Sequence, residues 1–272
     1  MKIKLIILFL LFLTFSWGQK KELRLAKKLF EKEEYNKAKD LLDQNKGLFE
    51  IADLKIKSQY NLLLSSIYRV NGDFSSAFEK LKEVKKDPSM ESLYDLESEK
   101  LKADCVNTAI EDSNKKNFSE SVENLYIAYS INPEENIEYL YFAASNSVNA
   151  KDYSRALEYY IVLKKNKYTG IITEYFITEI ENNEEKQVTK EEFVILSKSK
   201  SYTNPRSQET KSRFPEIVKN IALIHNQLGN KEMAIKAVKD ARDSNPEDID
   251  LILTEANIYI ELGEKEKFRS LI

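Results

Sequence analysis

The chain has 272 residues, of which 42% are hydrophobic and 32% charged, with 45 acidic residues against 42 basic ones. This composition is too apolar for a disordered protein, and six glycines and five prolines are few for an all-β fold built on many turns. A net charge of −3 without basic blocks argues against nucleic acid as a partner, because such binding depends on neutralising phosphates.

The N-terminus has the pattern of an export signal. Two lysines precede an apolar run from Leu5 to Phe15, and Ser16 and Gly18 are small residues suited to cleavage. As a helix, the run would be about 16 Å long, well short of a hydrocarbon core of about 30 Å. We therefore predict that residues 1–18 are a signal peptide and that the mature protein lies in the periplasm or cell envelope. This transient segment would be its only contact with the membrane.

A pair of small residues twelve positions apart, with a turn between them, recurs through most of the chain. Ala222 and Gly229 are matched 34 positions later by Ala256 and Gly263. A period of 34 is typical of helix–turn–helix repeats that must stack to bury their apolar faces. The small residues are Ala26, Ser65, Ala109, Ala144, Ala222 and Ala256 in the first helices and Ala38, Ala77, Ser121, Ala156 and Ala234 in the second.

The spacing between successive turns is uneven. It is 39 residues from Tyr35 to Phe74 and 44 from Phe74 to Phe118, so the first two repeats are expected to carry longer helices or loops. Between Tyr153 and Lys231 the chain has 44 residues more than one period. This excess predicts an insertion between the fourth and fifth repeats.

The insertion, residues 171–212, differs from the repeats in composition. A stretch rich in β-branched and aromatic residues, followed by two asparagines, predicts a β-hairpin over residues 171–188. Thr189 and Glu192 form a capping-box pattern that predicts a short helix. The polar residues 199–213 are expected to form a loop. The inward-facing residues of the short helix are expected to be Phe193, Val194 and Leu196.

This pattern resembles the tetratricopeptide repeat, in the form found in exported bacterial proteins, over roughly residues 20–170 and 213–272. The resemblance implies an all-α fold, an α-solenoid of stacked antiparallel helix hairpins. It comprises six repeats, the last one incomplete, with a small β-hairpin-containing insertion. Residues 19–170 would form repeats one to four and residues 213–272 repeats five and six. The sequence departs from the family at Phe268, which replaces a small residue in the last repeat.

Reactive side chains are scarce, since the chain has one histidine and one cysteine. His225 occupies the position that Tyr68 and Tyr259 take in other repeats, so we expect it to pack between helices; a pH-sensing or ligand role is the alternative. Cys105 is expected to be a buried thiol. The sequence contains no catalytic triad pattern, histidine-based zinc site or glycine-rich phosphate loop. We predict a protein that is not an enzyme and uses no cofactor or metal.

The family resemblance implies that the first helices line a concave groove that holds a partner segment. In repeat two, the exposed groove positions would be Gln59, Leu62, Ser66 and Arg69. Amide side chains can form hydrogen bonds with the backbone of an extended peptide, and this favours a second set of residues, in the later repeats, as contacts for a partner. The residues predicted to contact a protein or peptide partner are Tyr141, Asn149, Lys219, Asn226, Gln227 and Asn257.

Two functions remain open. The first is a protein–protein interaction scaffold of the bacterial cell envelope. The second is a glycan-binding envelope protein, although sugars commonly bind flat aromatic platforms and the chain would lose its single tryptophan, Trp17, with the signal peptide. The apolar residues near Ile272 also predict either further C-terminal repeats or end-to-end self-association, because solenoids need polar ends.

Overall fold

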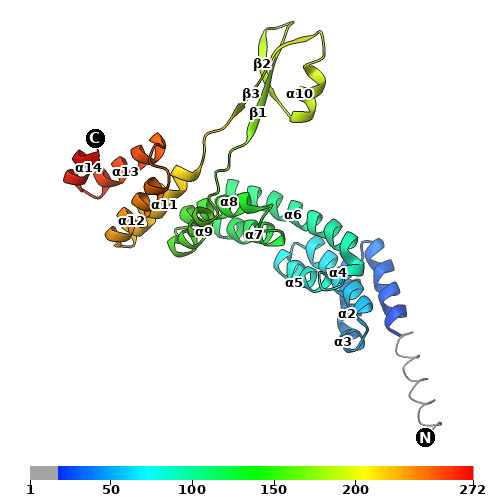
Figure 1. Ribbon diagram of the computed structural model, residues 1–272. Coiled ribbons are helices and arrows are strands. Elements are labelled where there is room, and N and C mark those ends of the chain that lie inside the picture. The colour runs from blue at the N-terminus through cyan, green and yellow to red at the C-terminus, as the bar shows by residue number, and fades with distance from the viewer. Residues whose placement is uncertain (1–17, 272) are drawn as a thin grey trace, which may run out of the picture. The chain divides into compact units, whose positions relative to one another are not determined.

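The computed structural model describes residues 18–271, so the predicted signal peptide lies almost entirely outside the described residues. The chain divides into two compact units between Asp152 and Tyr153, and helices dominate both (Figure 1). No helix among the described residues is both long and apolar enough to cross a bilayer.

The N-terminal unit consists of helices. Residues 18–31 form its first described helix. The elements that follow are α2 (Tyr35–Gln44), α3 (Lys46–Glu50), α4 (Leu54–Val70), α5 (Phe74–Val84), the 3₁₀ helix η1 (Pro88–Met90), α6 (Glu91–Asn114), α7 (Phe118–Ile131) and α8 (Ile137–Asn149).

The C-terminal unit combines helices with a small sheet. Its elements are α9 (Tyr153–Lys165), β1 (Thr173–Glu179), β2 (Glu184–Val188), α10 (Lys190–Leu196), β3 (Tyr202–Glu209), α11 (Phe214–Gln227), α12 (Lys231–Ser244), α13 (Ile249–Glu261) and α14 (Lys265–Leu271).

Six helix–helix turns share one backbone conformation. In each, the residue immediately before the second helix donates its N–H to the carbonyl five residues earlier, as from Asp73 to Tyr68 (2.9 Å) and from Asn230 to His225 (2.7 Å). The residue just before this donor is left-handed, which is the Schellman way of ending a helix. The left-handed residues, with φ between 62° and 80°, are Glu33, Gly72, Lys116, Lys151, Gly229 and Gly263.

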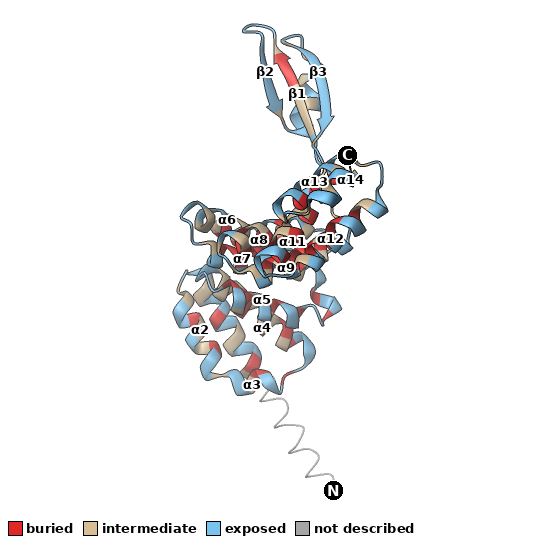
Figure 2. Cartoon of the chain, turned by 90° about the vertical axis from the view of Figure 1, so that its left-hand side faces the viewer, coloured by how far each residue is buried: buried red, intermediate tan, exposed pale blue. Residues whose placement is uncertain are grey.

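Within each unit, the paired small residues lie where the two helices of a hairpin come together. All of them are buried except Ala256, which is half-buried. Two pairs also bond across the hairpin: the Ser65 hydroxyl donates to the Ala77 carbonyl (2.9 Å), and the Ser121 hydroxyl donates to the Ala109 carbonyl (2.8 Å). The predicted register of the hairpins is therefore confirmed. In Figure 2 the buried residues appear as red segments that alternate with exposed and intermediate ones along the helices.

The longer spacing of the first two repeats has two structural causes. The extra helix α3 follows α2 and packs Phe49 against Tyr60 of α4, with ring centroids 4.4 Å apart. In the next interval, η1 precedes α6, which is 24 residues long. The expectation of longer helices or loops in these two repeats is confirmed.

The insertion forms a three-stranded antiparallel sheet in the order β2-β1-β3. The predicted hairpin is confirmed as β1 and β2, but the expected loop over 199–213 is wrong because Tyr202–Glu209 pairs with β1 as a third strand. The register shifts by one residue opposite Ile177, where β3 carries Asn204 with φ 50° and Pro205. A bulge of this kind accommodates proline, which cannot donate to the ladder.

The short helix α10 begins with the predicted capping box. The Thr189 hydroxyl accepts from the Glu192 N–H, and the Glu192 carboxylate accepts from the Thr189 N–H. Phe193 packs on Tyr175 of β1, with ring centroids 5.0 Å apart. The expectation that Val194 faces inward is wrong, since it is 51% exposed; the seven-residue helix covers the strand with only one narrow face.

Candidate functional site

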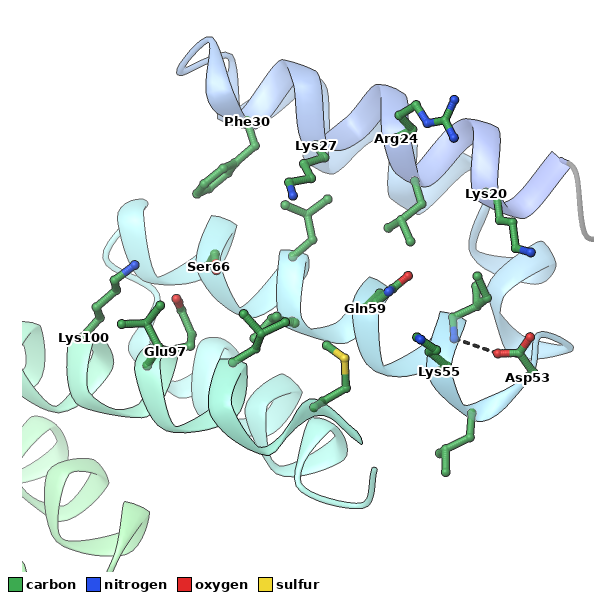
Figure 3. Close-up of a pocket in the computed structure, with 18 residues that line it drawn as sticks. Lys20, Arg24, Lys27, Phe30, Asp53, Lys55, Gln59, Ser66, Glu97 and Lys100 are labelled. Atoms are coloured by element: carbon green, nitrogen blue, oxygen red, sulfur yellow. Dashed lines mark hydrogen bonds between the residues drawn. The ribbon is translucent and has the colours of Figure 1, made fainter. Parts of the chain in front are cut away.

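A groove in the N-terminal unit is the clearest candidate site, and we call it the N-terminal groove. It has a volume of about 1120 Å³ and lies between the helix at residues 18–31, α4 and the start of α6 (Figure 3). Small-molecule pockets usually span about 300–1,000 Å³. The N-terminal groove exceeds this range, so its size suits a segment of a chain better than a small ligand.

The inside of the N-terminal groove is apolar. Several of its leucines are far more exposed than core residues: Leu54 is 52%, Leu93 48% and Leu96 53% exposed. Such residues are ordinary when scattered singly, but several in one concavity indicate a surface that a partner covers. The apolar residues lining the groove are Leu23, Phe30, Leu54, Ile56, Leu62, Leu63, Met90, Leu93 and Leu96.

The rim of the N-terminal groove is basic. Lys20, Arg24 and Lys27 follow one another at helical spacing on the first described helix, while Lys55 and Lys100 come from α4 and α6. In Figure 3, Lys27 reaches down from its helix and Lys100 reaches up from α6. Within residues 18–271, none of these five cations lies within 4.0 Å of a carboxylate.

The two acidic residues that line the groove are occupied by structural contacts. Asp53 caps α4 by accepting a hydrogen bond from the Ile56 N–H at 2.9 Å. Glu97 is only 5% exposed and accepts from Arg69 Nε at 2.8 Å, and Arg69 also donates to Asp104 at 2.6 Å. These contacts leave the basic charge of the rim uncompensated from within the groove.

The repeat-two positions predicted to line the concave surface fall largely in this groove. Gln59, Leu62 and Ser66 line it and are half-buried, and their role in holding a partner stays a prediction. Arg69 instead serves the ion pairs with Glu97 and Asp104.

The six residues predicted to contact a partner lie elsewhere. Tyr141 and Asn149 belong to α8 of the N-terminal unit, and the other four belong to α11 and α13 of the C-terminal unit. Tyr141 is predicted to contact a partner from an exposed position of the concave surface, and this exposure is wrong because Tyr141 is only 6% exposed. Its ring meets the Phe142 ring edge-on at 5.5 Å, and Ala144, one turn further along α8, is also buried.

Four of the remaining predicted contacts are available to solvent, and their binding role stays a prediction. Asn149, Asn226, Gln227 and Asn257 are exposed, whereas Lys219 is half-buried. On α13, Ile249 is 70%, Leu253 55% and Ile260 58% exposed. Self-association through this end of the repeats likewise stays a prediction.

The two reactive side chains are both buried, as predicted. Burial raises the pKa of the Cys105 thiol to about 12, so it is un-ionised at neutral pH. His225 is 9% exposed, its Nδ1 has no partner among the described residues, and burial lowers its pKa. Within residues 18–271 no group of three or more His, Cys, Asp or Glu side chains could hold a metal ion.

Comparison with known proteins supplies little beyond the fold. No family model and no curated protein matches the sequence. Among solved structures, the chain is similar to PilF of Pseudomonas aeruginosa, at 10% identity over 95% of this chain and 90% of that chain, with a TM-score of 0.34. It is also similar to a tetratricopeptide repeat protein of Parabacteroides merdae, at 12% identity over 94% of this chain and 77% of that chain, with a TM-score of 0.35.

A third similar structure is MamA, at 13% identity over 76% of this chain and 87% of that chain, with a TM-score of 0.36. The recurring small-residue pairs and left-handed turns of the structure itself define helix hairpins of the tetratricopeptide type. Repeats of this kind present extended binding surfaces.

The sequence analysis did not predict the basic rim, because the partner-contacting residues were chosen mainly for their amide groups and not for their charge. A signal was present: Lys20, Arg24 and Lys27 alternate with Leu23 and Phe30 at helical spacing. The contributions from α4 and α6 could not be found this way, since they depend on how the helices pack.

Proposed function

We propose that the chain is a non-enzymatic protein–protein interaction scaffold of the bacterial cell envelope that holds a segment of its partner in the N-terminal groove. The observation that carries this proposal is the concavity of about 1120 Å³ with exposed leucines inside it. An exposed apolar surface of this kind is stabilised when a complementary chain covers it.

The location in the envelope rests on the export pattern of residues 1–18. The packed part of the chain reaches back to Gln19, which is 6% exposed and donates a hydrogen bond to the Leu48 carbonyl at 2.8 Å. Cleavage after Gly18 would therefore leave the first hairpin whole. Cell fractionation with N-terminal sequencing tests this part: a mature chain that begins at Gln19 in the envelope fraction supports it, and an uncleaved cytoplasmic chain contradicts it.

The glycan alternative gains no support from this groove. Flat aromatic side chains are the usual platform for sugars, and Phe30 is the single aromatic among the described lining residues. We therefore retain the protein scaffold as the proposed function.

Site-specific photo-crosslinking in cells tests the proposed use of the groove. A photoreactive amino acid is placed at Leu96 or Gln59 inside the groove and, as a matched control, at the exposed Lys28 on the first helix. We expect the same protein to be captured from both groove positions and not from Lys28. Capture of no protein from either groove position, in cells where the scaffold is folded and present at its native level, would contradict the proposal.

A further inference from the structure

We propose that the segment bound in the N-terminal groove is an acidic amphipathic α-helix, with an apolar face against the leucines and carboxylates toward the rim. This inference rests on the proposed function and specifies the chemistry of the partner at the same site.

The charge of the groove is opposite to that of the chain as a whole. The full sequence has more acidic than basic residues, 45 against 42, whereas the groove lining has five basic residues and two acidic ones. Both acids are engaged, Asp53 in capping α4 and Glu97 with Arg69. Five cations line one groove with no carboxylate within 4.0 Å of any of them among the described residues, so the groove carries a net positive charge that would attract an acidic segment.

The chemistry inside the groove favours a helix over an extended strand. An extended peptide must find partners for its backbone N–H and C=O groups when it is covered. Among the lining residues that the structure describes, the only uncharged polar side chains are those of Gln59 and Ser66. A helix satisfies its backbone internally and needs only an apolar surface for one face, as in other helix-in-groove complexes.

The dimensions are compatible with a short helix. The rim formed by residues 20–30 of the first helix runs about 15 Å, since a helix rises about 1.5 Å per residue. A partner helix of about ten residues would span that length and present three or four apolar side chains to Leu62, Leu93 and Leu96.

Other anionic partners fit this site less well. A membrane surface is broad and cannot enter a concavity between three helices. Nucleic acid would place charged phosphates against leucines that make up much of the lining. The concave apolar interior with cations at its edge selects a partner that is apolar on one face and acidic on the other.

The first test uses two synthetic peptides of fourteen residues with blocked ends and identical leucines along one helical face. One peptide carries Glu at the polar positions and the other carries Lys. Fluorescence anisotropy of the labelled peptides is measured with the purified chain lacking residues 1–18. We expect the Glu peptide to bind with a Kd on the order of 10 μM and to weaken as salt rises. Equal binding of the Lys peptide would overturn the inference.

Charge reversals supply the matched control. Lys27→Glu changes a groove cation, and Lys28→Glu makes the same change on the next residue of the same helix, which does not line the groove. We expect Lys27→Glu alone to weaken Glu-peptide binding by about fivefold and Lys28→Glu, with the same change in net charge, to leave it within about twofold. Adding Lys100→Glu to Lys27→Glu should extend the loss to about tenfold or more. An equal loss from Lys28→Glu would show that only the net charge matters, which contradicts a groove site.

Two further readouts address conformation and apolar contact. Circular dichroism should show the Glu peptide gaining helix on binding, and Leu96→Ser should weaken binding without altering the fold, since Leu96 is already 53% exposed. A bound peptide that stays non-helical, or anionic lipid vesicles that bind the chain better than the Glu peptide does, would overturn the inference.

The experiments distinguish a failure of the proposed function from a failure of the inference that the bound segment is an acidic helix. If photo-crosslinking from Leu96 captures a protein but the Glu peptide does not bind, the scaffold stands and the acidic helix is wrong. If the peptide binds but no protein is captured in cells, the chemistry of the groove stands and its proposed use in the envelope is wrong.

Discussion

The helical repeats and the sheet of the insertion are held together in different ways. In the repeats, every hairpin contributes several fully buried side chains, whereas in the sheet only Ile177 and Thr178 of β1 are buried (Figure 2). The sheet relies instead on ladder hydrogen bonds and surface pairs. On one face, Arg206 binds both oxygens of Glu185, at 2.8 and 2.7 Å, and lies 4.1 Å from the centre of the Phe176 ring.

This difference indicates that the two regions fail differently when they are damaged. Burial of apolar area dominates folding free energy, while exposed ion pairs contribute little. A lesion in a repeat core should lower the stability of its whole unit. A lesion in the sheet should be confined to residues 171–212.

The largest contrast is expected from truncating one core residue in each region. Leu81→Ala, in the core shared by α4 to α7, should lower the free energy of unfolding of the N-terminal unit by about 2–5 kcal/mol through lost burial and a cavity. Ile177→Ala should abolish hydrogen-exchange protection in the sheet and leave the repeat helices protected. Hydrogen exchange with mass spectrometry measures both, and equal loss of protection across the C-terminal helices in Ile177→Ala would contradict local failure.

The second prediction concerns a buried charge that only the repeats contain. Arg69→Ala leaves Glu97, 5% exposed, without its partner at 2.8 Å. An unpaired buried charge is costly, and we expect a loss of about 3 kcal/mol in denaturant unfolding. The matched control is Arg206→Ala in the sheet. Its partner Glu185 is exposed, so we expect this variant to lose almost no stability. If the two variants lost similar stability, this distinction between the regions would be wrong.

The third prediction uses pH. Burial lowers the folded-state pKa of His225 below the ordinary value of about 6.5, so the unfolded state binds a proton that the folded state resists. The C-terminal helices should therefore have their full stability above about pH 6.5 and lose stability as the pH drops below it. The loss is at most about 1.4 kcal/mol for each unit by which the folded-state pKa of His225 lies below its unfolded-state pKa.

Replacing the titrating group separates this effect from the titration of carboxylates. His225→Tyr, the residue that other repeats place there, should flatten stability between about pH 5 and 7, whereas carboxylates titrate below that window. Thermal melts across this range measure the slope. A slope that His225→Tyr leaves unchanged would assign the pH dependence to another group.

A smaller, local effect is expected at the start of α10. Thr189→Ala removes the capping-box hydroxyl and should cost the insertion about 1 kcal/mol. Hydrogen exchange of α10 and β2 measures it, with Thr189→Ser as the control that keeps the hydroxyl. Unchanged exchange in the alanine variant would show that Phe193 on Tyr175 is sufficient to hold the helix.

The smallest effect is a stabilisation within the repeats. Lys116 adopts φ 65° at the turn position that Gly72 and Gly229 occupy in other hairpins. Lys116→Gly should raise the unfolding free energy by about 0.5 kcal/mol, because relief of left-handed strain exceeds the added entropy of the unfolded chain. Denaturant unfolding measures it, and a loss of stability would show that the Lys116 side chain contributes more than its backbone strain costs.

The sequence by itself determined the hairpins and their register. Small residues such as Ala38 and Ala234 are needed wherever two helices approach closely, and the turns before Phe74 and Phe118 repeat a local backbone pattern. Local chemistry was equally sufficient at Thr189 and Glu192, since a capping box is formed by neighbours in the chain. These features depend on contacts within one hairpin, and the sequence pattern therefore carries them.

Tertiary structure decided the rest. Tyr202–Glu209 is a strand because β1 offers it a partner for backbone hydrogen bonds, which its own polar side chains do not signal. Tyr141 is buried because of what packs on its side of α8. The basic rim of the N-terminal groove exists because packing brings Lys27 and Lys100, 73 residues apart in the chain, to the edge of one concavity. Contacts between distant segments depend on the sum of many packing interactions, and no single stretch of sequence specifies that sum.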